Sequence, residues 1–160
     1  MNITEAQRVI VEQHTSSIPV RVGKLGKDLG LEIVLAGLSP NISGLIEPSS
    51  TAQSGFVIKV NKYESEERQR FTIAHEISHF LLHRDHIKNG VVDNVMYRSS
   101  LSSRKETEAN KLAADILMPN SLVVKELSEI GGKRDEVAAI ALARKFRVSA
   151  AAMKVRLGIA

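Results

Sequence analysis

The sequence predicts an α+β protein in which a small, mostly antiparallel sheet of three strands is followed by helices. Between residues 31 and 60, three short runs rich in Val, Ile and Leu are separated by clusters of Gly, Pro, Ser and Asn, the pattern of strands joined by turns. After residue 65 the apolar residues recur every three or four positions, which indicates amphipathic helices. The sheet is therefore expected in the first half of the chain and a helical part in the second.

Each element of the first half has its own local signal. Residues 4–14 carry apolar side chains at helical spacing, and Pro19 opens a second short helix that Gly30 is expected to stop. The strands are expected at residues 31–36, 42–47 and 55–60. Because their connections are short, they suit an antiparallel or mixed sheet rather than parallel crossovers. The last strand could pair with an extended peptide at a sheet edge, or it could be an ordinary core strand.

A long helix is expected from Ser65 to about His83. Ser65 is a good N-cap, and the two glutamates that follow it favour the positive end of the helix dipole. A loop over residues 84–103 leads to a helix over residues 104–117. Two or three further helices are expected from residue 120 onward, with breaks at residues 131–132 and 147–149.

The composition fits one domain with a substantial core. The chain has 160 residues, of which 43% are hydrophobic, and no run long enough to span a bilayer. Its first five residues lack the order of a signal peptide, so the cytoplasm is the expected location. We expect a core over residues 1–132 and a helix-turn-helix-like pair over residues 133–160, packed as part of the same domain.

Cysteine content and charge restrict the chemistry further. The chain has no cysteine, which excludes disulfide bonds and thiolate ligands, so any metal must be held by His, Asp or Glu. The net charge of +4 is unevenly distributed. Residues 133–160 hold seven Lys and Arg against two acidic residues (+5), whereas the rest of the chain holds 15 against 16 (−1). The basic character therefore belongs to the C-terminal helices.

The most informative motif is His75-Glu76-Ile77-Ser78-His79. Residues four apart lie on the same helical face, so His75 and His79 can both present a ring nitrogen to one metal ion. Glu76 lies beside them, where it could take a proton from a water on the metal. This arrangement is typical of zinc hydrolases, although an ordinary helix with two partly exposed histidines also fits the bare motif.

A catalytic zinc site needs a third protein ligand, and Glu106 is the favoured candidate. It shares one face of the helix over residues 104–117 with Asn110 and two alanines, which allow another helix to approach closely. Asn110 could accept a hydrogen bond from the second ring nitrogen of a ligating histidine. Glu108 is the close alternative, but it points with charged neighbours toward what looks like a solvated face.

Four other residues are weaker candidates for the third ligand. Asp85 would need a glycine at position 82 to break the helix, and that position is leucine. His83 lies another helical turn along, too far for a shared tetrahedral site. His86 and Asp93 lie in the expected loop and stay open as candidates.

Two longer blocks that contain these residues resemble the ImmA/IrrE family of zinc metallo-endopeptidases. They run from Arg70 to His83 and from Glu106 to Pro119. Shorter similarities at residues 18–20, 29–32 and 42–46 extend the resemblance over nearly the whole chain. Ser78 departs from the glycine common in relatives, but it keeps a small side chain.

The resemblance implies a gluzincin-like fold, with the sheet packed on the His-Glu-x-x-His helix of a metallopeptidase core. It also implies one Zn²⁺ ion held by His75, His79 and Glu106, with Glu76 as the catalytic base for attack by zinc-bound water. The implied substrate is a protein, a helix-turn-helix repressor, and no membrane is involved. An oxyanion donor is also expected; the candidates are Tyr97, Arg98, His86 and His83.

The strongest alternative is a DNA-binding or protein-binding regulatory module of a mobile element or of a toxin–antitoxin-like pair. Residues 137–146 and 150–157 form a helix-turn-helix-like pattern with a basic bias. Against DNA binding, Arg147 stands where glycine usually supplies a positive φ, and the second helix begins with three alanines that cannot read bases. A metal-dependent interaction protein without turnover is a third alternative, against which the presence of Glu76 argues.

Overall fold

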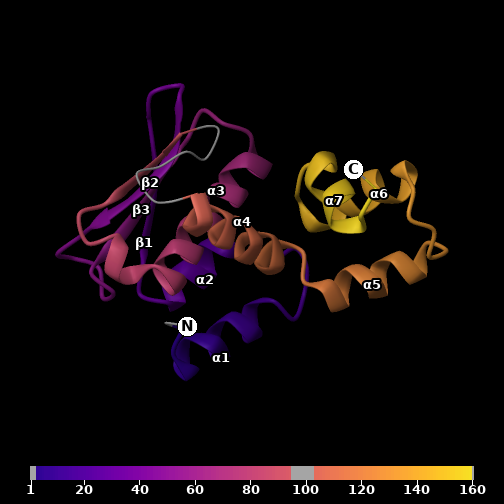
Figure 1. Cartoon of the computed structure of the whole chain (residues 1–160), viewed down its shortest axis with the longest axis horizontal. Helices are drawn as coiled ribbons and strands as arrows, with labels where there is room; N and C mark the ends of the chain where they lie inside the picture. The colour runs from indigo at the N-terminus through magenta and orange to yellow at the C-terminus, as the bar shows by residue number, and fades with distance from the viewer. Residues whose placement is uncertain (1–2, 95–102, 160) are drawn as a thin grey trace.

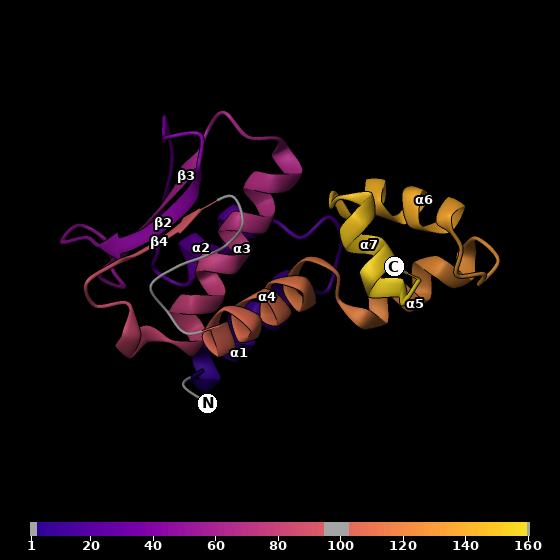
Figure 2. The ribbon, with the colours of Figure 1, turned by 45° about the horizontal axis from the view of Figure 1, so that its top comes forward.

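The computed structural model describes residues 3–94 and 103–159 and has the predicted α+β architecture. Its elements in chain order are α1 (Glu5–His14), α2 (Val22–Asp28), β1 (Glu32–Ala36), β2 (Ile42–Pro48), β3 (Phe56–Asn61), α3 (Glu66–Leu82), a 3₁₀ turn (Arg84–His86), β4 (Val91–Asn94), α4 (Ser103–Leu117), α5 (Asn120–Glu129), α6 (Glu136–Phe146) and α7 (Ala150–Leu157). Figures 1 and 2 show the sheet at one end, α5–α7 at the other, and α3 and α4 between them.

The sheet is mixed and, in the described residues, has four strands in the order β1-β3-β2-β4. Strand β2 runs antiparallel to both β3 and β4, whereas β1 runs parallel to β3. The expectation of three strands was therefore one short, because β4 lies in the segment predicted to be a loop. This strand has only two apolar residues, Val91 and Val92, and its partner β2 lies far earlier in the chain, so no local pattern marks it.

Of the two possibilities left open for the third strand, the sheet edge is not observed. β3 lies between β1 and β2, and its side chains are almost all buried. The edges of the sheet in the described residues are β1 and β4. β3 is therefore the core strand that the sequence left as the other possibility.

Helix α3 is the central element of the fold. Ser65 caps it as predicted, because its side chain accepts a hydrogen bond from the Arg68 amide at 3.2 Å. Every residue from Thr72 to Leu81 is buried, since the sheet, α2 and α4 all pack against this helix. The sheet approaches it closely at Gly44, where an added Cβ atom would lie 2.5 Å from Thr72 Cγ2.

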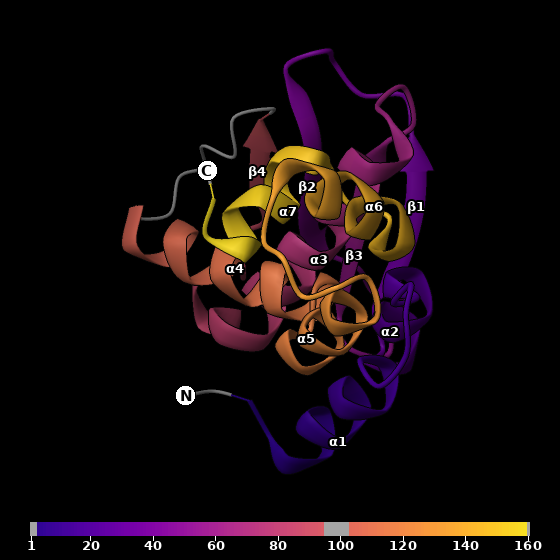
Figure 3. The same cartoon turned by 90° about the vertical axis from the view of Figure 1, so that its right-hand side faces the viewer.

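The C-terminal helices join the same hydrophobic core. Leu142, Phe146 and Met153 are fully buried and belong to one cluster with Ile58 and Ile77. Viewed from that end in Figure 3, α5–α7 lie in front of α3 and the sheet. The division of the chain at residue 132 stays a prediction.

The junction between α6 and α7 is fastened to α3 by backbone contacts. The Arg70 guanidinium donates hydrogen bonds to the carbonyl oxygens of Arg147 and Phe146 at 3.1 and 3.3 Å. Arg147 itself adopts the left-handed conformation, with φ +54° and ψ +50°. The lack of glycine at this position therefore does not prevent a left-handed residue between α6 and α7, so this part of the argument from the sequence against DNA binding does not hold.

Candidate metal centre

Helix α3 places His75, Glu76 and His79 inside the protein. All three side chains have no exposed surface, because this turn of α3 is enclosed by its neighbours. The imidazole rings of His75 and His79 project from the same face, with centroids 4.6 Å apart and planes nearly perpendicular. Their Nε2 atoms lie 3.1 Å apart, so both could coordinate a single metal ion.

Helix α4 contributes the buried carboxylate of Glu106 to the same point. Its Oε1 atom lies 2.9 Å from His79 Nε2, and its Oε2 atom lies 3.2 Å from His75 Nε2. Helices α3 and α4 can approach this closely because Ala109 and Ala113 are small and fully buried at the interface. The structure thus brings together the three residues that the sequence predicted as metal ligands.

The spacing of these atoms suits a tetrahedral metal ion. With metal–ligand bonds of about 2.0–2.1 Å, adjacent ligand atoms of such a site lie about 3.3 Å apart. The two Nε2 atoms are 3.1 Å apart, close to that value, and each has a Glu106 oxygen within 3.2 Å, Oε1 beside His79 and Oε2 beside His75. Two imidazole nitrogens and one carboxylate, without sulfur, form a donor set that leaves one tetrahedral position open. The three side chains therefore fit a catalytic metal ion.

Two hydrogen-bond contacts connect His79, through His83, to Glu108 on α4. His79 Nδ1 lies 3.0 Å from His83 Nδ1, and His83 Nε2 lies 3.0 Å from Glu108 Oε1. If His79 Nε2 binds a metal, its proton must sit on Nδ1, which then donates to His83. His83 must in turn hold its proton on Nε2 and donate to Glu108. One consistent set of tautomers therefore connects the metal position to a partly exposed carboxylate.

The pKa shifts of His83 and Glu108 agree with a neutral His83 side chain. Burial is the main cause that lowers the pKa of His83, and it outweighs the opposing hydrogen bond to Glu108. The hydrogen bond from His83 in turn lowers the pKa of Glu108. A neutral imidazole beside an ionised carboxylate is the pair that the tautomers require.

Sequence reasoning missed this role of His83 and Glu108. Glu108 was considered only as a metal ligand or a solvated residue, whereas the structure pairs it with His83. The available signal was the spacing of four between His79 and His83, which places both rings on one face of α3. The partner on α4 could not be found in this way, because the register between two helices is a tertiary property.

The remaining candidates lie elsewhere. Asp85 and His86 are exposed on the 3₁₀ turn, and Asp93 lies in β4, where its backbone pairs with Gly44. Neither Asp85 nor His86 belongs to the group that could hold a metal within the described residues. Tyr97 and Arg98 lie outside the described residues, so their suggested oxyanion role stays a prediction.

Asn110 lies on α4, one turn beyond Glu106. Its Oδ1 atom is buried and has no hydrogen-bond partner among the described residues. The predicted hydrogen bond from a ligating histidine is therefore not formed in this structure. The structure does give the centre another ring-orienting contact, the one between His83 and His79.

Comparison with known proteins agrees with this geometry. A family model of peptidase M78, described as the IrrE N-terminal-like domain, matches residues 29–158. The chain is 36% identical to the radiation response metalloprotease IrrE of Deinococcus radiodurans over 94 residues, which cover 59% of this chain and 28% of that protein. It is 39% identical to the protein of the same name from Deinococcus deserti over 94 residues, covering 59% and 33%. The matched region is thus a third or less of each relative.

Proposed function

Because the chain belongs to the ImmA/IrrE family of metallopeptidases, we propose that it is a zinc-dependent endopeptidase. The observation that carries this proposal is that one ligand atom each from the buried His75, His79 and Glu106 lie within 4.8 Å of one another. Two histidines and a glutamate are the ligand set of catalytic zinc in several metallopeptidases. Bound zinc would supply Lewis acidity that activates water and polarises the scissile carbonyl.

Glu76 is the general base in this proposal. It follows His75 on α3, and its side chain is buried. Its carboxylate takes the proton of the attacking water and delivers it to the nitrogen of the leaving amine. His83 and Glu108 hold the His79 ring in one tautomer and one orientation while this occurs.

The substitution Glu76→Gln tests the role of the base. It keeps the size of the side chain but removes the proton-accepting oxygen, so we expect retained metal binding and loss of peptide cleavage by about two orders of magnitude or more. Metal content by elemental analysis and hydrolysis of a mixed peptide library measure the two effects. Cleavage by Glu76→Gln at the wild-type rate refutes the assignment.

The substrate is proposed to be a protein, specifically a helix-turn-helix repressor. This part rests on the family resemblance, in which such repressors are frequent partners. Incubation of the metal-loaded protein with a repressor encoded in the neighbouring reading frame, followed by mass spectrometry, identifies the cut site. An intact repressor under conditions where peptides are cleaved excludes that repressor as the substrate.

DNA binding by the C-terminal helices is the less favoured function. Of the seven basic residues in 133–160, four are engaged in ion pairs within the protein, at 2.9–3.0 Å: Lys145 with Glu126, Arg147 with Glu66, Lys154 with Glu136, and Arg156 with Asp115. These cations are not free for phosphates, which supply most of the affinity for DNA. A salt-sensitive mobility shift of duplex DNA by the whole chain would favour this function instead.

In the described residues, no helix combines the length and the apolar character needed to cross a membrane.

A further inference from the structure

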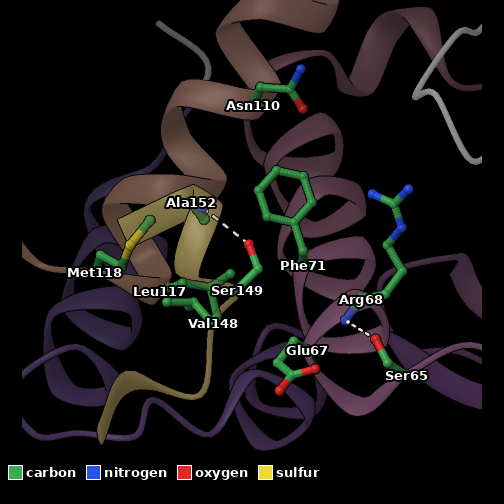
Figure 4. A pocket seen from close by; sticks show the side chains of 10 residues that line it. All are labelled: Ser65, Glu67, Arg68, Phe71, Asn110, Leu117, Met118, Val148, Ser149 and Ala152. Carbon is green, nitrogen blue, oxygen red and sulfur yellow. Dashed lines mark hydrogen bonds between the residues drawn. The ribbon is translucent and has the colours of Figure 1, made fainter. Parts of the chain in front are cut away.

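A pocket of about 390 Å³ lies between α3, the end of α4 and the start of α7 (Figure 4). Its apolar lining consists of Phe71, Leu117, Met118, Val148 and Ala152. Leu117, Met118 and Val148 are buried and form the interior, whereas Phe71 and Ala152 are only partly buried. The volume is at the small end of the range of about 300–1,000 Å³ that is usual for ligand pockets.

This pocket adjoins the metal centre on two sides. Phe71 precedes His75 by one helical turn, and the two rings are stacked with centroids 6.3 Å apart and planes at 28°. Asn110, which also lines the pocket, follows Glu106 by one turn of α4. One helical turn advances about 5.4 Å, and one residue of an extended peptide advances about 3.3 Å. A peptide held at the metal centre can therefore place a neighbouring side chain in the pocket.

The polar groups of the pocket do not favour a charged occupant. Glu67 and Arg68 line it with opposite charges, both near the start of α3. The Ser149 hydroxyl is engaged as the N-cap of α7, where it accepts a hydrogen bond from the Ala152 amide at 3.0 Å. A charged side chain buried against the apolar lining would lose hydration, which one amide oxygen, Asn110 Oδ1, and the exposed Glu67 replace only in part. An aliphatic or aromatic side chain would instead gain by leaving water.

We propose that this pocket receives an apolar side chain of the substrate, from a residue beside the scissile peptide bond. This inference rests on the proposed endopeptidase function and names a determinant of its specificity. The wall contributed by Val148 and Ala152 makes the C-terminal helix pair part of the substrate site. Ala152 sets the width of the pocket from the side of α7.

A series of peptide hydroxamates tests the pocket without requiring turnover. The members carry hydrogen, isobutyl or benzyl on the carbon next to the metal-chelating group, and calorimetry measures their affinity for the zinc-loaded protein. We expect the isobutyl and benzyl members to bind about 10- to 100-fold more tightly than the hydrogen member, because burying such a group is favourable by that factor.

The substitution Ala152→Leu fills the pocket and should abolish most of this preference while leaving the affinity for the hydrogen member within about twofold. Ala151→Leu is the matched control, because Ala151 is the exposed neighbour on the same helix and does not line the pocket. It should keep the wild-type preference. Circular dichroism and thermal melting check that both variants are folded, and Ala152→Val replaces Ala152→Leu if the latter is not.

Two results overturn the assignment of the pocket. One is equal or undetectable affinity of the wild-type protein across the series, and the other is an unchanged preference in the folded Ala152 variant. The outcome is separable from that of the proposed function. A protein that discriminates among hydroxamates but cuts no peptide would refute the endopeptidase and keep the pocket, whereas cleavage without any side-chain preference would do the reverse.

Discussion

His79 and His83 face each other through their Nδ1 atoms at 3.0 Å, and His83 reaches Glu108 through its other ring nitrogen. The contact joins two successive turns of α3, and it gives His79 a fixed acceptor for its Nδ1 proton. Its value for the metal centre can be measured, because His83 is not itself placed among the atoms that could hold the ion.

The substitution His83→Ala should weaken metal binding by about 10- to 100-fold, the usual effect of removing a group that orients a ligating histidine. Competition with a chromophoric zinc chelator measures the affinity. His86→Ala is the control, since His86 is exposed on the 3₁₀ turn, and it should bind zinc as the wild type does. Equal affinities of the two variants would show that the His83 contact does not support the centre.

Metal binding should stabilise the fold through Glu106 and not through Glu108. A ligand present at about 100 times its dissociation constant adds about 2.7 kcal/mol to the stability, which corresponds to a rise of roughly 5–10 °C in Tm for a chain of this size. Differential scanning fluorimetry with zinc and with a chelator measures the rise. Glu106→Ala should abolish it, whereas Glu108→Ala should retain most of it. The opposite pattern would reassign the third ligand.

Two glycines provide a matched test of packing. In Gly44→Ala the new Cβ would lie 2.5 Å from Thr72 Cγ2 and 2.8 Å from the Lys59 carbonyl oxygen, so strand and helix must separate at a cost of about 1–3 kcal/mol. Gly23, on α2, has no atom within 4 Å of its Cβ position. Gly23→Ala should therefore stabilise the protein by about 0.5–1 kcal/mol. Urea unfolding checks both signs, and a neutral Gly44→Ala would contradict the close packing of the sheet on α3.

The stability of the sheet edge should depend on pH through Glu32. The hydrogen bond from Ser49, which has the larger effect, and the one from Thr51 lower the pKa of this carboxyl below its ordinary value of 4.5. The folded state therefore prefers the ionised form, and its added stability is present above pH 4.5 and is lost as the pH falls through the lowered pKa.

Unfolding by urea at a series of pH values between about 3 and 6 measures this dependence. Glu32→Gln should reduce the loss of unfolding free energy at acid pH. Ser49→Ala should reduce it in part, because this substitution removes the hydrogen bond with the larger effect on the Glu32 pKa. Identical curves for the wild type and Glu32→Gln would show that this carboxyl does not contribute.

Local sequence patterns were sufficient to predict the helices and part of the candidate metal centre. Ser65 marked the start of α3 because capping is a property of neighbouring residues, and the His-Glu-x-x-His spacing placed two rings on one face by helical geometry alone. The alanine face of α4 led to Glu106, which the structure places beside both rings.

Features that depend on distant partners could not be predicted in this way. β4 is recognisable as a strand only beside β2, and the parallel pairing of β1 with β3 depends on how the whole sheet is assembled. The pairing of Glu108 with His83 depends on the register of α4 against α3. Arg147 adopts a left-handed conformation, which is intrinsically unfavourable for a residue other than glycine, at a turn whose carbonyl oxygens accept hydrogen bonds from Arg70.

The hydrogen bonds from Arg70 to the turn between α6 and α7 have a consequence for how the sequence of these helices can change in evolution. The guanidinium grips main-chain oxygens of residues 146 and 147, which exist whatever side chains those positions carry. Changes in the exposed side chains of α6 and α7 can therefore accumulate without removing these two hydrogen bonds to α3, the helix that bears the two histidines. The pocket wall on α7 can in this way vary between related proteins while the two histidine rings stay aligned.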